Sequence, residues 1–184
     1  MPDTRPNIVI FQAEDTGRQQ HCYGDPYART PHIDRLADQG CRFTNAITVA
    51  PVCAPSRGCT VTGRYPTKLG NHLMRSTLID PPKLVTEVLR EHGYYVNWAN
   101  KTDFNLEPPD SFADDRTFWI DELENAKLPD QPFLLYYNFS MTHESQLWPP
   151  GFKVGQEPPV DEPGYAADRH GGVPVPPYLP DTPV

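Results

Sequence analysis

Asn7-Ile8-Val9-Ile10-Phe11 is a short, continuous apolar run near the start of this 184-residue chain. A run of this length without polar alternation is typical of a β-strand that is buried on both faces. Two later runs have the same character, Tyr94-Tyr95-Val96-Asn97-Trp98 and Phe133-Leu134-Leu135-Tyr136-Tyr137-Asn138-Phe139. The sequence therefore predicts three strands, of which the first and the last are buried.

Amphipathic segments separate these strands. The first begins with Thr30-Pro31, an N-cap followed by a first-turn proline, and ends at Gly40. A second helix is predicted within residues 84–93 and a third within residues 116–126. Strands that alternate with helices imply right-handed crossovers and a mostly parallel sheet flanked by helices, so the predicted fold class is α/β.

The end of the chain has a different composition. Ten of the 23 prolines lie between Pro149 and Pro183, and turn-forming residues replace apolar periodicity. Compact domains seldom contain so long a stretch without regular structure. We therefore divide the chain into a domain body, residues 1–147, and a proline-rich segment, residues 148–184, that either wraps over a further body or is disordered.

Charge and hydropathy exclude some classes of partner. The chain has 16 Lys and Arg against 24 Asp and Glu, so a net charge of -8 gives no footprint for nucleic acid or an anionic membrane. No apolar run is long enough to cross a bilayer, and residues 1–6 lack the apolar stretch of a signal peptide. We expect a cytoplasmic protein, or a periplasmic or secreted one if the true start lies upstream.

Polar residues that follow the strands are the first candidates for a site, because ligands of parallel sheets bind beyond the carboxyl ends of the strands. Glu14 and Asp15 are oxygen donors suited to Ca²⁺ or Mg²⁺, although adjacent acids are also common in solvated turns. Lys101 could hold an anionic ester or simply face solvent. His143 could donate a proton to a leaving group, or be a hydrogen-bonded structural histidine.

Cys53 is the candidate nucleophile. Pro55 favours the first turn of a helix that would continue to Gly63, which places Cys53 at the helix N-terminus. There the free N–H groups and the helix dipole would favour a thiolate and attract an anion, and Arg57 adds a cation one turn later. A buried, unreactive cysteine before a helix remains the alternative. No spacing among the four cysteines matches a zinc site, and three disulfide pairings would be open in a secreted protein.

Together these motifs resemble the formylglycine-dependent sulfatases of the alkaline phosphatase superfamily, over nearly the whole chain. Cys53-Ala54-Pro55-Ser56-Arg57-Gly58 is similar to the signature whose cysteine is oxidised to formylglycine, and Thr62-Gly63-Arg64-Tyr65-Pro66 to the sequence that follows it. Ala13-Glu14-Asp15 resembles the acidic metal pair that follows the opening strand, and residues 30–37 the first helix.

The resemblance implies an alkaline-phosphatase-like fold and hydrolysis of a sulfuric ester or sulfamate. Cys53, converted by a formylglycine-generating or maturase enzyme, would form a geminal diol that attacks sulfur. It implies that Glu14, Asp15 and the modified Cys53 bind the cation, usually Ca²⁺ with Mg²⁺ as the other possibility. Arg57 would orient the diol, Lys101 would bind the sulfate and His143 would lie near the leaving group.

Three departures from the family pattern qualify this expectation. Glu14 stands where an aspartate is usual, and Lys101-Thr102-Asp103 lacks the histidine found two residues after the lysine in many members. This variant, together with residues 142–148, is similar to the heparan N-sulfatase-like branch, which suggests a sulfated sugar as substrate. The chain also ends before the later metal ligands of the family, so residues 148–184 would lead into a C-terminal part not contained here.

Two other functions remain open at this stage. An inactive fragment or pseudo-enzyme would carry the same motifs without turnover. A phosphoesterase of the same superfamily would normally have serine or threonine as nucleophile, and Cys53 argues against it.

Overall fold

The computed structural model describes residues 4–116, 128–147 and 180, which form two compact units. Unit 1 comprises residues 1–14 and 45–141, and unit 2 comprises residues 15–44 and 142–184. The third predicted helix and the proposed boundary at residue 148 lie outside the described residues. No helix in the described ranges is long and apolar enough to cross a membrane.

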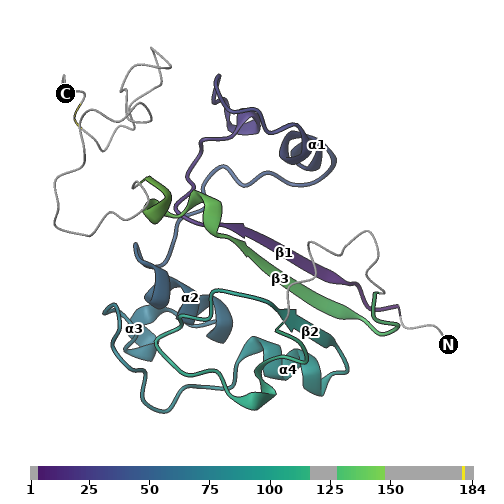
Figure 1. Cartoon of the computed structure of the whole chain (residues 1–184), viewed down its shortest axis with the longest axis vertical. Helices are drawn as coiled ribbons and strands as arrows, with labels where there is room; N and C mark the ends of the chain where they lie inside the picture. The colour runs from purple at the N-terminus through teal and green to yellow at the C-terminus, as the bar shows by residue number, and fades with distance from the viewer. Residues whose placement is uncertain (1–3, 117–127, 148–179, 181–184) are drawn as a thin grey trace. The chain divides into compact units, whose positions relative to one another are not determined.

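Unit 1 contains a three-stranded parallel sheet (Figure 1). The strands are β1 (Ile8–Ala13), β2 (Tyr95–Trp98) and β3 (Phe133–Phe139), in the order β1-β3-β2. Ile8 is paired with Leu134 and Tyr95 with Phe133, so all three strands start at the same edge. The predicted α/β class with a parallel sheet is confirmed, and the sequence placed β3 within its observed bounds.

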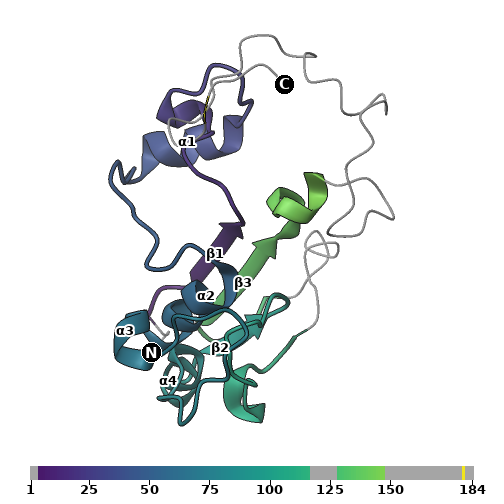
Figure 2. The ribbon, with the colours of Figure 1, turned by 90° about the vertical axis from the view of Figure 1, so that its left-hand side faces the viewer.

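The helices of unit 1 are α2 (Cys53–Thr62), α3 (Pro66–Leu69), α4 (Val85–Glu91) and the short 3-10 turn η2 (Asp110–Phe112). Figures 1 and 2 show α2, α3 and α4 on one side of the sheet. The helix α2 ends as predicted, because Gly63 adopts the left-handed conformation (φ 65°) and its N–H donates to the Cys59 carbonyl at 2.8 Å. The short η4 (Ser140–Thr142) follows β3.

An aromatic core joins the sheet to these helices. The ring of Trp98 stacks on Tyr136 with centroids 3.7 Å apart and meets Phe104 edge-on at 5.7 Å. Phe112 completes the aromatic group, and all four side chains are at most 2% exposed. Burial of large rings contributes most of the hydrophobic stabilisation of a small domain, so this cluster fixes β2 and β3 against the loops that follow β2.

The sequence prediction was wrong about the burial of the first strand. Val9 is 49% exposed and Phe11 is 54% exposed, although β1 forms where it was expected. Its apolar run met the criterion for a doubly buried strand, but β1 is an outer strand and the aromatic core gathers on β2 and β3 instead. Among the described residues, the core therefore lies beside β1 rather than around it.

Unit 2 contains η1 (His21–Tyr23), α1 (Pro31–Gln39) and η5 (Glu144–Leu147). The predicted first helix and its first-turn proline are confirmed. Thr30 precedes the helix, but its hydroxyl donates to the Asp34 carboxylate at 3.1 Å instead of capping a backbone N–H. Asp34 also accepts the backbone N–H of Cys22 at 2.9 Å, which fastens α1 to η1.

Candidate active site

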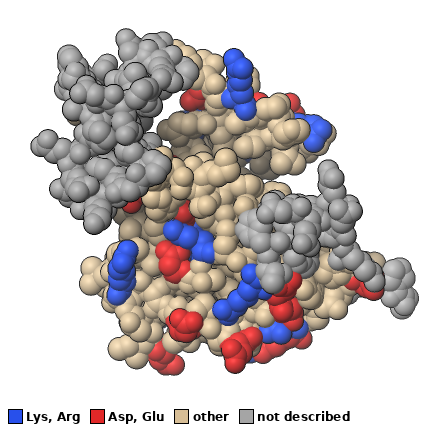
Figure 3. All heavy atoms as spheres, viewed as in Figure 1, with Lys and Arg blue, Asp and Glu red and all other residues tan. Residues whose placement is uncertain are grey.

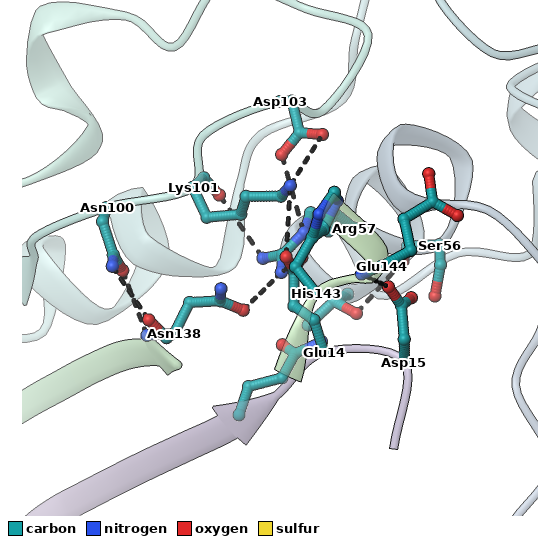
Figure 4. Close-up of polar contacts among 12 residues, drawn as sticks. Glu14, Asp15, Ser56, Arg57, Asn100, Lys101, Asp103, Asn138, His143 and Glu144 are labelled. Atoms are coloured by element: carbon teal, nitrogen blue, oxygen red, sulfur yellow. Dashed lines mark hydrogen bonds and ion pairs between the residues drawn. The ribbon is translucent and has the colours of Figure 1, made fainter. Parts of the chain in front are cut away.

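Arg57 is the centre of a buried polar network in unit 1 (Figure 4). Its side chain is 3% exposed and projects from α2 toward the carboxyl ends of β1 and β3. One guanidinium nitrogen, Nη2, donates to Glu14 Oε1 and Asn138 Oδ1, and the other, Nη1, donates to the Tyr136 hydroxyl at 2.9 Å and the Lys101 carbonyl at 3.4 Å. This planar fork therefore joins α2 to both strands and to the loop after β2.

Lys101 and Asp103 extend this network toward solvent. The Lys101 Nζ lies 3.2 Å from Glu14 Oε2 and 4.0 Å from Asp103 Oδ2, and Arg57 Nε lies 3.5 Å from Asp103 Oδ1. We call Glu14, Arg57, Lys101 and Asp103 the charge cluster. It contains two cations and two carboxylates, so its formal charge is zero.

Glu14 is the buried anion of the charge cluster, with a side chain only 5% exposed. Burial alone would raise the pKa of its carboxyl, but hydrogen bonds and charge from Arg57 and Lys101 outweigh burial and hold the pKa below its usual value. Glu14 is therefore ionised at neutral pH.

Elsewhere on the face of unit 1 in Figure 3, acidic and basic side chains are interspersed.

Gly58 allows α2 to approach the rest of the site. A Cβ added there would collide with Asn71 Nδ2 and would lie 2.8 Å from the Phe104 carbonyl oxygen. Asn71 is itself buried and accepts a hydrogen bond from Asn105 Nδ2 at 2.6 Å. Only glycine at position 58 leaves room for Asn71 and the Phe104 carbonyl to approach α2. This requirement explains why a glycine directly follows Arg57.

The loop after β2 is held in an uncommon conformation. Asn100 donates from Nδ2 to the Asn138 carbonyl at 2.9 Å and accepts the Asn138 N–H at 3.0 Å, which fastens the loop to the end of β3. Lys101 then has a φ of 55°, in the left-handed region that non-glycine residues seldom occupy. Strained residues of this kind gather at functional sites.

Cys53 is the first residue of α2, as the sequence predicted. Val52 before it is extended (φ −153°), and its carbonyl accepts the N–H of Ser56 at 3.2 Å, which closes the first helical turn. The Cys53 side chain is half-buried and its thiol is free, as are the other three cysteines. Cys53 therefore stands one turn before Arg57 on the helix that carries the centre of the network.

The remaining predicted residues belong to unit 2. Asp15 accepts the backbone N–H of Glu144 at 2.9 Å (Figure 4). The Nδ1 atom of His143 lies 2.9 Å from the Ser145 hydroxyl oxygen. The structure thus brings Glu14, Arg57 and Lys101 together in unit 1, whereas the approach of Asp15 and His143 to them stays a prediction.

The sequence reasoning missed several members of the network. Tyr136 and Asn138 were assigned only to an apolar strand. Asp103 was noted only because it stands where many members of the family have a histidine. A signal was present: Tyr136 and Asn138 alternate along β3, and Gln12 occupies the matching face of β1 beside Asn138. The Tyr136 hydroxyl donates to Gln12 Oε1, so these side chains form a polar row beneath Arg57.

Comparison with known proteins gives the family. The family model described as Sulfatase matches residues 6–172. The chain belongs to the sulfatase family. An ulvan-active sulfatase of Formosa agariphila is 34% identical over 163 residues, which cover 79% of this chain and 26% of the relative. Human arylsulfatase A is 36% identical over 114 residues, covering 58% of this chain and 22% of the relative.

Solved structures agree with this assignment. One protein, solved in complex with its substrate D-glucosamine-2-N,6-O-disulfate, has a TM-score of 0.66 and 26% identity, over 77% of this chain and 35% of that one. A 2-O glycosaminoglycan sulfatase has a TM-score of 0.61 at 18% identity over 85% of this chain and 40% of that one, a likeness of fold alone. The chain spans about a quarter of the length of the first curated sulfatase.

Sulfatase family membership implies a divalent cation, which the described residues do not accommodate by themselves. Within the described ranges, no group of three or more His, Cys, Asp or Glu side chains is placed to hold a metal ion. Both carboxylate oxygens of Glu14 already face a cation, Arg57 or Lys101. A metal ion at Glu14 would need further ligands and would compete with these two side chains.

Proposed function

We propose that this chain is the N-terminal part of a sulfuric ester or sulfamate hydrolase whose nucleophile is formylglycine made from Cys53. The observation that carries the proposal is the position of Cys53 at the start of α2, one turn before the buried Arg57 and its partner Lys101. A helix start favours an anionic group. When hydrated, the aldehyde would supply one hydroxyl whose oxygen attacks sulfur and displaces the alcohol or amine of the substrate; deprotonation of the second hydroxyl would then expel sulfate and re-form the aldehyde.

The described side chains suggest a division of roles. Arg57 faces a protein acceptor with each of its guanidinium nitrogens, so we assign it the positioning of α2 and Glu14. Lys101 is 25% exposed, enough to meet an incoming sulfate group. Asp15 and His143 keep the roles that the family implies, cation binding and protonation of the leaving group.

The proposed substrate is a sulfated sugar. The support is the likeness to an ulvan-active sulfatase and to the protein solved with D-glucosamine-2-N,6-O-disulfate. The Lys101-Thr102-Asp103 variant led us to the heparan N-sulfatase-like branch, and we keep sulfamate hydrolysis as a proposal beside hydrolysis of an O-sulfate ester.

The test begins with the chemical state of Cys53. The chain is produced together with a formylglycine-generating enzyme, and the tryptic peptide 43–57 is examined by mass spectrometry for replacement of the thiol by an aldehyde. Sulfate release from an aryl sulfate and from D-glucosamine-2-N,6-O-disulfate is then measured with Ca²⁺, with Mg²⁺ and with a chelator. We expect turnover that Cys53→Ala abolishes. Absence of turnover in aldehyde-bearing protein with metal would refute activity of this chain.

A second candidate is a chain that folds or binds without turnover. One observation favours it: both carboxylate oxygens of Glu14, a predicted metal ligand, already face Arg57 or Lys101. This function predicts that an aldehyde-bearing chain binds sulfate but releases none from either ester. The same assay therefore separates the two candidates.

A further inference from the structure

Asp103 is the loosely held member of the charge cluster. Glu14 is 5% exposed and lies 3.2 Å from Lys101, whereas Asp103 is 38% exposed and lies 4.0 Å from the same nitrogen. Its distance to Arg57 Nε, 3.5 Å, is also long for a charge-assisted hydrogen bond. Glu14 is therefore a fixed part of the fold, and Asp103 is the carboxylate that can move away.

The charge of the cluster limits what can bind beside Lys101. Its two cations are balanced by two carboxylates, so an arriving sulfate group adds an unbalanced negative charge. Arg57 is almost fully buried, which leaves the 25% exposed Lys101 as the cation that a dissolved anion can reach. Asp103 stands on this exposed side, close to both cations, and would repel the anion unless it is displaced.

The backbone conformation of the loop after β2 keeps Asp103 beside Lys101. Asn100 is fastened to β3 by two hydrogen bonds, and Lys101 itself is held at a φ of 55°. Asn105 also has a left-handed backbone conformation (φ 62°), and its side-chain amide donates a hydrogen bond to Asn71 Oδ1. The segment that carries Lys101 and Asp103 is therefore held at both ends. The backbone of this segment is thus fixed near Lys101, whereas the Asp103 side chain is 38% exposed.

We propose that Asp103 is an internal counter-anion that pairs with Lys101 and Arg57 until the sulfate group of the substrate displaces it. Asp103 then sets the affinity for sulfate: it weakens binding of the free ion and leaves Lys101 neutralised while the site is empty. This inference rests on the proposed function, in which Lys101 receives the sulfate.

The test measures binding and involves no turnover. The 184-residue chain with unmodified Cys53 is titrated with inorganic sulfate by isothermal titration calorimetry at neutral pH, as wild type and as Asp103→Asn. Removal of one repulsive charge at a partly exposed site should tighten binding by about fivefold to tenfold. Asp110→Asn is the matched control, because it removes an exposed acid of unit 1 that has no ion pair with Lys101 or Arg57. Its affinity should stay within about twofold of wild type.

A double variant identifies the place of binding. Lys101→Met combined with Asp103→Asn should lose the gain in affinity, because Lys101, the cation that Asp103→Asn frees, is then absent. Circular dichroism of each variant establishes that it is folded. Equal sulfate affinity of wild type and Asp103→Asn, no binding by either, or a gain that persists without Lys101 would each overturn the inference. A hydrolase that fails to turn over leaves these binding results unaffected, so the two proposals fail separately.

Discussion

Replacement of Arg57 by methionine should remove a large part of the stability of unit 1. Arg57 and Glu14 are 3% and 5% exposed, so the change leaves a buried carboxylate with Lys101 as its remaining cation. Asn138 Oδ1 and the Tyr136 hydroxyl also lose their guanidinium donor. Removal of one partner from a buried ion pair costs about 3–5 kcal/mol, a substantial share of the 5–15 kcal/mol that stabilises a typical domain.

Urea denaturation measures this cost. With Trp119 and Trp148 replaced by phenylalanine, fluorescence of the buried Trp98 reports the unfolding of unit 1. Lys83→Met is the matched control: Lys83 and Glu91 form a 2.5 Å ion pair, but their side chains are 53% and 56% exposed. Its cost should stay below about 1 kcal/mol.

A second comparison separates burial from charge. Glu14→Gln combined with Arg57→Met removes both charges and should be less destabilising than the sum of the single variants. If Arg57→Met costs no more than Lys83→Met, the buried pair does not hold α2 to the sheet and the reasoning is refuted.

Gly58→Ala should destabilise the chain by about 1–3 kcal/mol through overpacking, and equal melting temperatures for it and the exposed control Thr60→Ala would contradict the close approach of α2. Tyr136→Phe should cost about 1–3 kcal/mol because it unpairs buried polar groups, and a cost under about 0.5 kcal/mol would show that the hydroxyl is dispensable. Acid should destabilise the protein: the folded pKa values of Glu14 and Glu87 are lowered, so their contribution is complete above the unfolded pKa of about 4.3 and is lost as pH falls through the folded values. Urea midpoints that stay constant from pH 6 to pH 3 would exclude this linkage.

Local signals in the sequence were sufficient for the elements of the fold. The helix that starts at Cys53 was predictable because Pro55 suits a first turn and Gly63 suits a left-handed stop. The strand β3 was predictable because its apolar run is long and bounded by turn residues. Each of these signals depends only on neighbours along the chain, which a sequence displays directly.

Burial and side-chain partnership were harder to predict, because they depend on residues far apart in the sequence. The apolar run of β1 has the composition of a buried strand, yet Phe11 is 54% exposed because the buried core cluster gathers on β2 and β3. Arg57 bonds with residues 43, 44, 79 and 81 positions away, and only the fold brings them together. Cys53 and Arg57 could be recognised from their sequence motif. The polar row formed by Tyr136, Asn138 and Gln12 could be recognised only from the three-dimensional structure.

Glu14 illustrates how one unusual residue follows from these partnerships. The family resemblance led us to expect an aspartate at this position. In the structure one oxygen of Glu14 meets Arg57 of α2 and the other meets Lys101 after β2. The longer arm spans two cations that approach from different elements, and Asp103 pairs with the same two cations from the solvent side. Glu14 and Asp103 thus belong to one arrangement of charge, in which two carboxylates face the same two cations.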